Sequence, residues 1–237
     1  NKMTVVKAES ADTAKLATAM CLCSDAELDE QAKTAVGEPT ECALVNHAYT
    51  LSLNKNELTK TSPRVGEAPF DSMRKMMSTI HSAQNGFTQY TKGAPDEILK
   101  RCTHILSKDG VVPLTDAQRD EIRRSNKAMA DNALRVLAAA YKDLSRKPEH
   151  FTPEALERDM IFLGLCGMID PIRPEVKAAI EKCRDAGINV VMITGDHKDT
   201  AAAIAKDLGI LADPSQAVMG QVLDGMPDEE LDRKIEK

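Results

Sequence analysis

Residues 188–196 read Ile-Asn-Val-Val-Met-Ile-Thr-Gly-Asp, an uncharged and largely apolar run that ends abruptly in glycine and aspartate. This pattern is typical of a buried parallel strand with a small polar tip at its carboxyl end. In open α/β sheets, ligands bind just beyond such carboxyl ends. The hydroxyl of Thr194 and the backbone N–H groups around Gly195 suit a phosphate oxygen. The alternative is an ordinary strand-to-helix turn in which Thr194 or Asp196 caps the next helix.

Length and composition predict a globular protein with room for two domains. The chain has 237 residues, of which 42% are hydrophobic and 29% charged. It contains no apolar run long enough to span a bilayer and no secretory signal at its start, so we expect a soluble chain. A net charge of −6 and an aromatic content of 3% argue against a nucleic-acid binder.

The cysteines and histidines do not indicate a metal site. The six cysteines are scattered through apolar segments without a Cys-x-x-Cys pair, which predicts reduced core thiols in a cytosolic protein. The five histidines include no His-x-x-x-His pair. No Walker A sequence, Gly-x-Gly-x-x-Gly fingerprint or Ser/His/Asp arrangement is present, so nucleotide binding of the P-loop or Rossmann kind is excluded.

Residues 1–170 are predicted to form an α+β domain, an antiparallel sheet flanked by helices. Gln84-Asn85-Gly86 is a hairpin turn between two strand candidates. Prolines mark the starts of two helices, at Pro39 and Pro95. The predicted helices cover residues 14–21, 39–48, 96–101 and 116–131, and the predicted strands cover residues 68–70, 74–80, 87–91, 135–141 and 162–169.

Residues 171–237 are predicted to form an incomplete α/β unit. Helical spacing from Pro174 to Gly187, the strand up to Asp196 and a second helix at 201–208 make half of a doubly wound sheet. Roughly seventy residues cannot complete such a sheet, which usually has about five or six strands. Pro171 and Pro174 would stiffen a hinge between the two parts.

Four residues in the first part have side chains that suit a nucleotide. The ring of Phe70 would stack on a base while the ammonium of Lys75 meets a phosphate; alternatively, Phe70 is core and Lys75 a solvated edge residue. Lys92 stands at a strand end, and the glycine after it would let a ligand approach the backbone; the alternative is a surface lysine in a loop. Arg135 would contact phosphate from a cleft edge, or else form a salt bridge.

Five segments, taken in order, resemble the P-type cation-transporting ATPases, most closely the calcium-pump branch and its bacterial members. One such motif would be weak evidence, but five with matching order and spacing cover nearly the whole chain. They are 69–77 (Pro-Phe-Asp-Ser-Met-Arg-Lys-Met-Met), 91–97 (Thr-Lys-Gly-Ala-Pro-Asp-Glu), 133–137 (Ala-Leu-Arg-Val-Leu), 170–173 (Asp-Pro-Ile-Arg) and 192–196 (Met-Ile-Thr-Gly-Asp).

The resemblance implies a cytoplasmic nucleotide-binding domain at 1–170, inserted in the parent between two halves of a phosphorylation domain with a haloacid-dehalogenase-like fold. Residues 171–237 would be part of that second domain. The parent enzyme would transfer the γ-phosphoryl group of ATP to an aspartate, with Mg²⁺, and couple hydrolysis of the acyl phosphate to transport of calcium across a membrane.

The resemblance also implies a role for each of ten residues. Phe70 would stack on adenine, with Glu41 contacting the adenine side. Lys75 and Lys92 would line the ATP pocket, and Gly93 would give close access to it.

The other five residues would contact or lie near phosphate groups. Arg135 would contact the phosphates of ATP, and Arg173, in the hinge, would lie near the nucleotide in a closed state. Thr194, Gly195 and Asp196 would bind the transferred phosphoryl group.

Several family features are missing from the sequence. The phosphorylated aspartate of Asp-Lys-Thr-Gly-Thr-Leu-Thr, the magnesium-binding Gly-Asp-Gly-x-Asn-Asp segment and all transmembrane helices are absent. We therefore expect a fragment that binds ATP but neither phosphorylates itself nor transports, its partners being the missing transmembrane, actuator and phosphorylation segments of the same parent. Ser72 stands where many relatives carry a basic residue, and His197 where asparagine is common. The His-Pro pair of heavy-metal pumps is absent.

Three alternatives remain open at this stage. A complete small phosphatase of the dehalogenase fold would need an Asp-x-Asp or Asp-Lys-Thr nucleophile, and none is visible. A non-catalytic regulatory or interaction module would have lost nucleotide binding. Within the family, the transported cation could be sodium or a proton instead of calcium.

Overall fold

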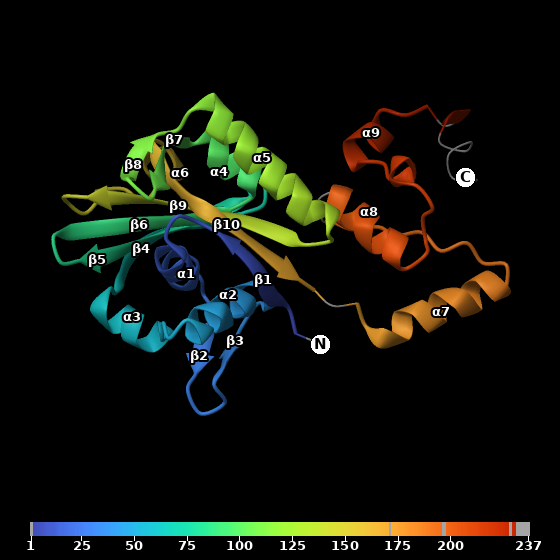
Figure 1. Cartoon of the computed structure of the whole chain (residues 1–237), viewed down its shortest axis with the longest axis horizontal. Coiled ribbons are helices and arrows are strands. Elements are labelled where there is room, and N and C mark those ends of the chain that lie inside the picture. The colour runs from blue at the N-terminus through green and yellow to red at the C-terminus, as the bar shows by residue number, and fades with distance from the viewer. Residues whose placement is uncertain (1, 171, 196–197, 228, 231–237) are drawn as a thin grey trace. The chain divides into compact units, whose positions relative to one another are not determined.

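The computed structural model describes residues 2–170, 172–195, 198–227 and 229–230, apart from the side chain of Gln221 (Figure 1). The chain divides into two compact units. The sheet unit comprises residues 2–126 and 136–170, and the helical unit comprises residues 127–135 and the described residues from 172 onward. No helix in the described part is long and apolar enough to cross a membrane.

An eight-stranded sheet forms the centre of the sheet unit. Its strands run in the order β4-β5-β6-β9-β10-β7-β8, with β1 also paired to β10. The bounds are β1 (Thr4–Glu9), β4 (Arg64–Asp71), β5 (Met76–Ala83), β6 (Gly86–Gly93), β7 (Cys102–Ser107), β8 (Gly110–Pro113), β9 (Arg135–Leu144) and β10 (Met160–Ile169).

The predicted antiparallel sheet is confirmed for β4, β5, β6 and β9 but is wrong for one pair. Strands β10 and β7 run parallel, so the sheet is mixed. The predicted hairpin is present, since Ala83 pairs with Gly86 across Gln84 and Asn85. Strand direction depends on which strands become neighbours, and that is set by connections between residues far apart in the sequence.

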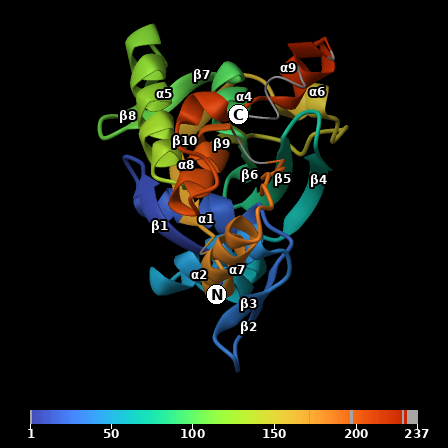
Figure 2. The same ribbon diagram turned by 90° about the vertical axis from the view of Figure 1, so that its right-hand side faces the viewer.

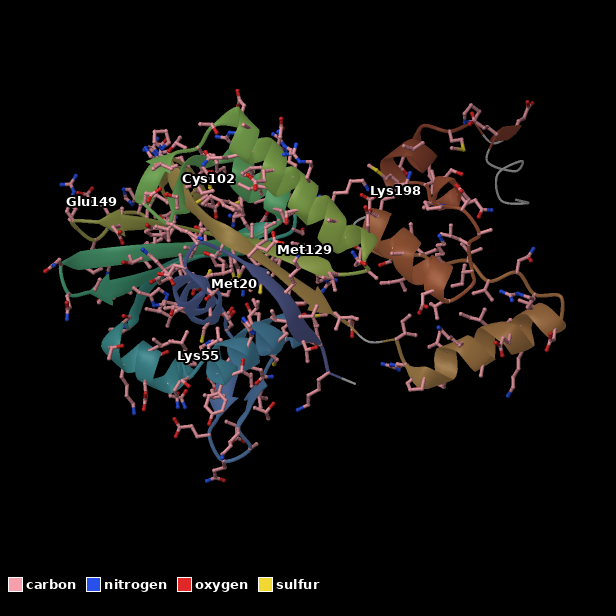
Figure 3. The ribbon with its side chains drawn as sticks, in the orientation of Figure 1. Met20, Lys55, Cys102, Met129, Glu149 and Lys198 are labelled. Atoms are coloured by element: carbon pink, nitrogen blue, oxygen red, sulfur yellow. The ribbon has the colours of Figure 1, made fainter. Side chains whose placement is uncertain are left out.

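One face of the sheet packs against α1 (Thr13–Leu22), α2 (Pro39–Thr50) and α3 (Lys55–Thr61) (Figure 1). Helix α1 begins where the Asp12 carboxylate accepts from the Lys15 backbone N–H, and α2 has Pro39 in its first turn and Glu38 as its cap. Met20 of α1 is buried in the core beneath the sheet (Figure 3). The two-stranded ribbon of β2 (Glu27–Asp29) and β3 (Thr34–Val36) protrudes beside α2 in both views (Figures 1 and 2).

The opposite face carries α4 (Pro95–Lys100) and α6 (Pro153–Leu156), and α5 (Asp116–Asp131) lies beyond them (Figure 1). Leu156 of α6 packs against Ala68 of β4 and Ile80 of β5 in a small buried cluster. Four of the six cysteines are buried and all six are free thiols, as predicted. Burial raises the pKa of the Cys21 thiol to about 11.

The helical unit contains α7 (Pro174–Asp185), α8 (Lys198–Asp207), a short 3₁₀ turn (Pro214–Gln216) and α9 (Gly220–Asp224). The two helices predicted around residues 174–187 and 201–208 are confirmed. The Arg184 guanidinium donates to the carbonyl of Gly209 at 2.7 Å. The Thr200 hydroxyl donates to the carbonyl of Leu134 at 3.3 Å.

The strand predicted over residues 188–196 does not form in the described part of that stretch. Residues 188–195 are irregular, and the side chains of Ile188, Val191 and Ile193 are 57%, 73% and 93% exposed. A strand forms only where neighbours take up its backbone N–H and C=O groups. The described residues of the helical unit are helical or irregular, apart from the first residue of β9, and offer no such neighbour. Asp196 lies outside the described residues.

Candidate functional site

The ends of three neighbouring strands meet at one end of the sheet and carry four of the predicted site residues. Asp71 at the end of β4 pairs with Met76 at the start of β5. Met76 in turn pairs with Gly93 at the end of β6, and Met77 pairs with Lys92. Residues around Phe70, Lys75 and Lys92, which are separated in the sequence, are therefore brought to the same end of the sheet.

A tight turn over residues 71–75 connects β4 to β5. The Lys75 N–H donates to the Asp71 carbonyl at 2.7 Å, and the Asp71 carboxylate accepts from the N–H groups of Met73 and Arg74 at 3.0 and 2.9 Å. Lys75 adopts a left-handed conformation with φ of 56°. Phe70 is 63% exposed and Lys75 is also exposed, so Phe70 is not a core residue.

The buried Lys92 forms an ion pair with the half-buried Glu41. The Lys92 ammonium donates to Glu41 Oε1 at 2.5 Å and to Ser24 Oγ at 2.9 Å, and only 6% of Lys92 is exposed. The other carboxylate oxygen of Glu41 accepts from the backbone N–H groups of Asp25 and Ala26 at 2.7 and 3.0 Å. The structure thus brings together two predicted residues, and it excludes the alternative that Lys92 is a surface lysine.

Two further cationic side chains, Lys55 and Arg64, donate hydrogen bonds to the loop at residues 24–26, which contacts Lys92 and Glu41. Lys55, at the start of α3 (Figure 3), donates to the carbonyls of Ser24 and Ala26 at 2.7 and 2.5 Å. Burial lowers the pKa of Lys55. Arg64 donates to the Ser24 carbonyl at 2.8 Å and to the Asp25 carboxylate at 2.7 Å. Sequence reasoning missed Ser24, Lys55 and Arg64, because they lie in no recognisable motif and gain their role only from the fold.

Gly93 permits a close approach, but to this chain's own backbone. A Cβ atom on Gly93 would lie 2.4 Å from the Lys75 carbonyl oxygen and 2.5 Å from Met76 Cβ. The same Lys75 carbonyl accepts from the Ala94 N–H at 2.9 Å. The glycine is therefore needed where β6 passes the 71–75 turn, and its predicted role toward a ligand stays a prediction.

The other predicted residues belong to the helical unit. Arg135 is exposed at the start of β9, and Arg173 is exposed immediately before α7. Thr194 and Gly195 are exposed in the irregular stretch, and the space around a Cβ on Gly195 is open. Asp196 lies outside the described residues, so the predicted phosphoryl site is described only in part.

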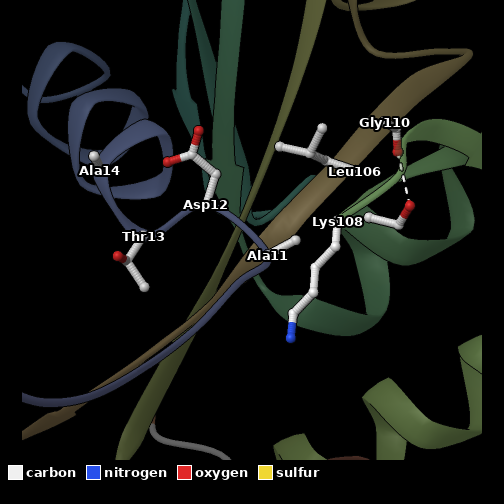
Figure 4. Close-up of a pocket in the computed structure, with 8 residues that line it drawn as sticks. Ala11, Asp12, Thr13, Ala14, Leu106, Lys108 and Gly110 are labelled. Atoms are coloured by element: carbon white, nitrogen blue, oxygen red, sulfur yellow. Dashed lines mark hydrogen bonds between the residues drawn. The ribbon is translucent and has the colours of Figure 1, made fainter.

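A surface hollow lies elsewhere in the sheet unit. It encloses about 490 Å³ between the start of α1 and the β7–β8 hairpin (Figure 4). Asp12 caps α1 there, and the Ser107 hydroxyl donates to the Gly110 carbonyl at 2.9 Å. None of the predicted site residues lines this hollow.

Comparison with known proteins gives the family of the chain. Residues 12–175 match the family model described as P-type ATPase, cytoplasmic domain N. Calcium-transporting ATPase 1 of Bacillus cereus is 46% identical over 92% of this chain and 24% of the relative. Calcium-transporting ATPase 1 of Lactococcus lactis is 38% identical over 100% of this chain and 28% of the relative. A calcium-transporting ATPase of Listeria monocytogenes is 42% identical over 91% of this chain and 24% of the relative.

The chain thus spans about a quarter of the length of these curated relatives. The family model covers well over half of the chain, including β4, β5, β6 and the strand ends described above. The chain therefore belongs to the P-type cation-transporting ATPases.

Proposed function

We propose that this chain is the ATP-binding part of a P-type ATPase that couples ATP hydrolysis, through an aspartyl-phosphate intermediate, to transport of calcium across a membrane. The names of the relatives support calcium as the cation. The observation that carries ATP binding is the 71–75 turn. The exposed residues Phe70, at the end of β4, and Lys75, in the turn, lie at the end of the sheet where β6 carries Lys92.

Phe70 and Lys75 would make the principal contacts within the sheet unit. An exposed phenylalanine ring gains by stacking on a base, because both flat surfaces leave water. The Lys75 ammonium would lie close enough to the bound base to reach a phosphate. Arg135 and Arg173 would contact the phosphates, as the family resemblance implies, and Mg²⁺ would accompany ATP in the full-length ATPase.

Glu41 would recognise the amino group of adenine while Lys92 holds the carboxylate in place. A carboxylate has about four lone-pair sites. Lys92 and the N–H groups of Asp25 and Ala26 occupy three of those sites. The remaining site would accept a hydrogen bond from the exocyclic amino group. In this proposal Lys92 acts through Glu41, because its ammonium is already neutralised.

Residues 1–170 would form the nucleotide-binding domain, and 171–237 would contribute to a phosphorylation domain of the haloacid-dehalogenase-like type. Thr194, Gly195 and Asp196 would bind the transferred phosphoryl group there. The aspartate nucleophile, the actuator and the transmembrane segments would come from other parts of the parent. The 237-residue chain alone is therefore expected to bind ATP without hydrolysing it.

Titration of the 237-residue chain with ATP, followed by NMR or calorimetry, tests the nucleotide site. We expect weak, saturable binding, because one ring stack is worth only about 1–3 kcal/mol. Phe70→Ser should weaken binding by about tenfold or more without unfolding the chain, since the ring is exposed. Val111→Ser is the matched control, because Val111 is an exposed residue of β8 at the other end of the strand order. Its affinity should equal that of the parent.

Lys75→Asn is the better second variant, because it removes the charge and asparagine tolerates the left-handed conformation. Lys92→Glu would instead place a second carboxylate beside Glu41 in a buried site and disturb folding. If the unmodified 237-residue chain is folded but does not bind ATP, the regulatory-module alternative is favoured. A dissociation constant in the low nanomolar range would contradict the expected weak binding.

A further inference from the structure

Glu157 is a buried carboxylate that belongs to no motif of the sequence. It follows α6, where its backbone N–H donates to the Pro153 carbonyl at 2.7 Å. Only 2% of its side chain is exposed. Glu157 Oε1 accepts from the guanidinium of Arg74 and from the Ser78 hydroxyl, the latter at 3.2 Å.

Arg74 joins this carboxylate to the turn that presents Phe70 and Lys75. One of its terminal nitrogens pairs with Glu157, and the other donates to the Pro69 carbonyl at 2.7 Å. Pro69 immediately precedes Phe70 in β4. The guanidinium therefore ties the backbone beside the exposed ring to a charge fixed in the interior.

The carboxylate is itself held by a chain of buried polar groups. Ser78 Oγ lies 2.8 Å from Thr91 Oγ1, and the Gln89 amide donates to that Thr91 oxygen and to the Leu156 carbonyl, both at 3.0 Å. Ser78, Thr91 and Gln89 are fully buried. Glu157 is thus fixed to β5 and β6 through hydrogen bonds and to β4 and β5 through the packing of Leu156.

We propose that Glu157 is a positioning residue for the nucleotide: through Arg74 it sets the conformation of the 69–75 segment and hence the direction of Phe70. This inference rests on the proposed ATP site. The Arg74–Glu157 pair adds little net stability, because desolvation of the two charges offsets their attraction. Its further hydrogen bonds, from Arg74 to the Pro69 carbonyl and from the Ser78 hydroxyl to Glu157, hold it in one geometry. The pair is therefore expected to matter more for binding than for folding.

The test compares ATP affinity with thermal stability in the 237-residue chain. Glu157→Gln, which keeps the shape and removes the charge, should weaken ATP binding by about tenfold, the size of change that loss of much of one ring stack produces. The double variant Arg74→Met/Glu157→Leu should bind as weakly while its Tm stays close to that of the parent, because no unpaired charge remains. If Glu157 had only a structural role, both variants would have a lower Tm, but at temperatures below that Tm they would bind ATP as tightly as the unmodified chain.

Arg119→Met is the matched control. Arg119 is also a half-buried arginine, and it donates to the carbonyls of Leu99 and Cys102 at 2.6 and 2.7 Å, away from the 71–75 turn. Its ATP affinity should equal that of the parent. The amide NMR shifts of residues 70–75 should change in Glu157→Gln, whereas those of the 84–86 hairpin turn should not.

The outcomes separate this inference from the proposed function. If the parent binds ATP and both Glu157 variants bind equally well, the positioning role is overturned and the ATP site stands. If Glu157→Gln no longer weakens ATP binding in a chain that already carries Phe70→Ser, the two residues act through one contact, as proposed. A folded parent chain that does not bind ATP would overturn the proposed function and, with it, this role for Glu157.

Discussion

Single side chains at the strand ends have roles that depend on their neighbours more than on their type. Lysine followed by glycine indicated a ligand site, and the structure gives both residues partners within the chain. Lys92 pairs with Glu41, and Gly93 makes room for Lys75 and Met76. The roles predicted for Lys92 and Gly93 toward a ligand stay predictions. The sequence could not name Ser24, Arg74 or Glu157, whose contacts join residues far apart along the chain.

Gly93→Ala should destabilise the sheet unit. The added Cβ would meet backbone and Cβ atoms that cannot move independently, so we expect a loss of about 1–3 kcal/mol, the usual cost of overpacking. Thermal unfolding followed by circular dichroism measures it. Gly220→Ala is the control, because a Cβ there has nothing within 4 Å and its Tm should match the parent's. Equal Tm values for both variants would contradict the steric role of Gly93.

Helices and strands were predictable where their own residues decide the outcome. The proline-started helices α2 and α4 and the β5–β6 hairpin follow from local signals, and all are present. The β7–β8 hairpin and the parallel β7–β10 pair are not among the elements predicted from the sequence. Residues 188–195 failed as a strand because an apolar run supplies the surface for burial but not the neighbouring strands.

Amide hydrogen exchange should distinguish the irregular stretch at residues 188–195 from the paired strands β5 and β6. Peptides covering residues 189–193 should exchange at least about a hundredfold faster than peptides from β5 and β6, because backbone outside helices and strands opens at little cost in free energy. Mass spectrometry after a series of labelling times measures the difference. Protection of residues 190–193 comparable to that of β5 would show that this stretch pairs as a strand in solution.

In the sheet unit, the buried side chain of His81 makes the stability of the fold depend on pH. His81 is 2% exposed, its Nδ1 lies 3.0 Å from the Ser62 carbonyl oxygen, and its Nε2 lies 2.9 Å from Thr79 Oγ1. Facing a carbonyl, Nδ1 must carry the proton, so Nε2 accepts from the Thr79 hydroxyl. Burial lowers the pKa of His81 to about 4, and the charges of Arg64 and Lys55 act in the same direction.

Stability should therefore fall as pH drops from 6.5 toward 4. The unfolded chain takes up a proton on His81 near pH 6.5, whereas the folded chain resists until about pH 4. The neutral ring's contribution is complete above pH 6.5, and roughly 3 kcal/mol of it is lost across this range. Urea unfolding at successive pH values measures the slope. His81→Gln should flatten the slope and His104→Gln should leave it unchanged, whereas equal slopes in all three proteins would contradict this account.

The pairing of β1 with β10 has a consequence for the order in which the strands pair during synthesis. Thr4 lies opposite Ile169, so the first strand of the sheet finds its partner only in the last. A ribosome adds about 5–20 residues per second, which leaves β1 without its neighbour for roughly ten to thirty seconds. The β5–β6 hairpin and α1 can form in that interval from contacts already synthesised. Because β10 also lies between β9 and β7, its arrival both gives β1 its partner and joins the β7–β8 hairpin to the other strands.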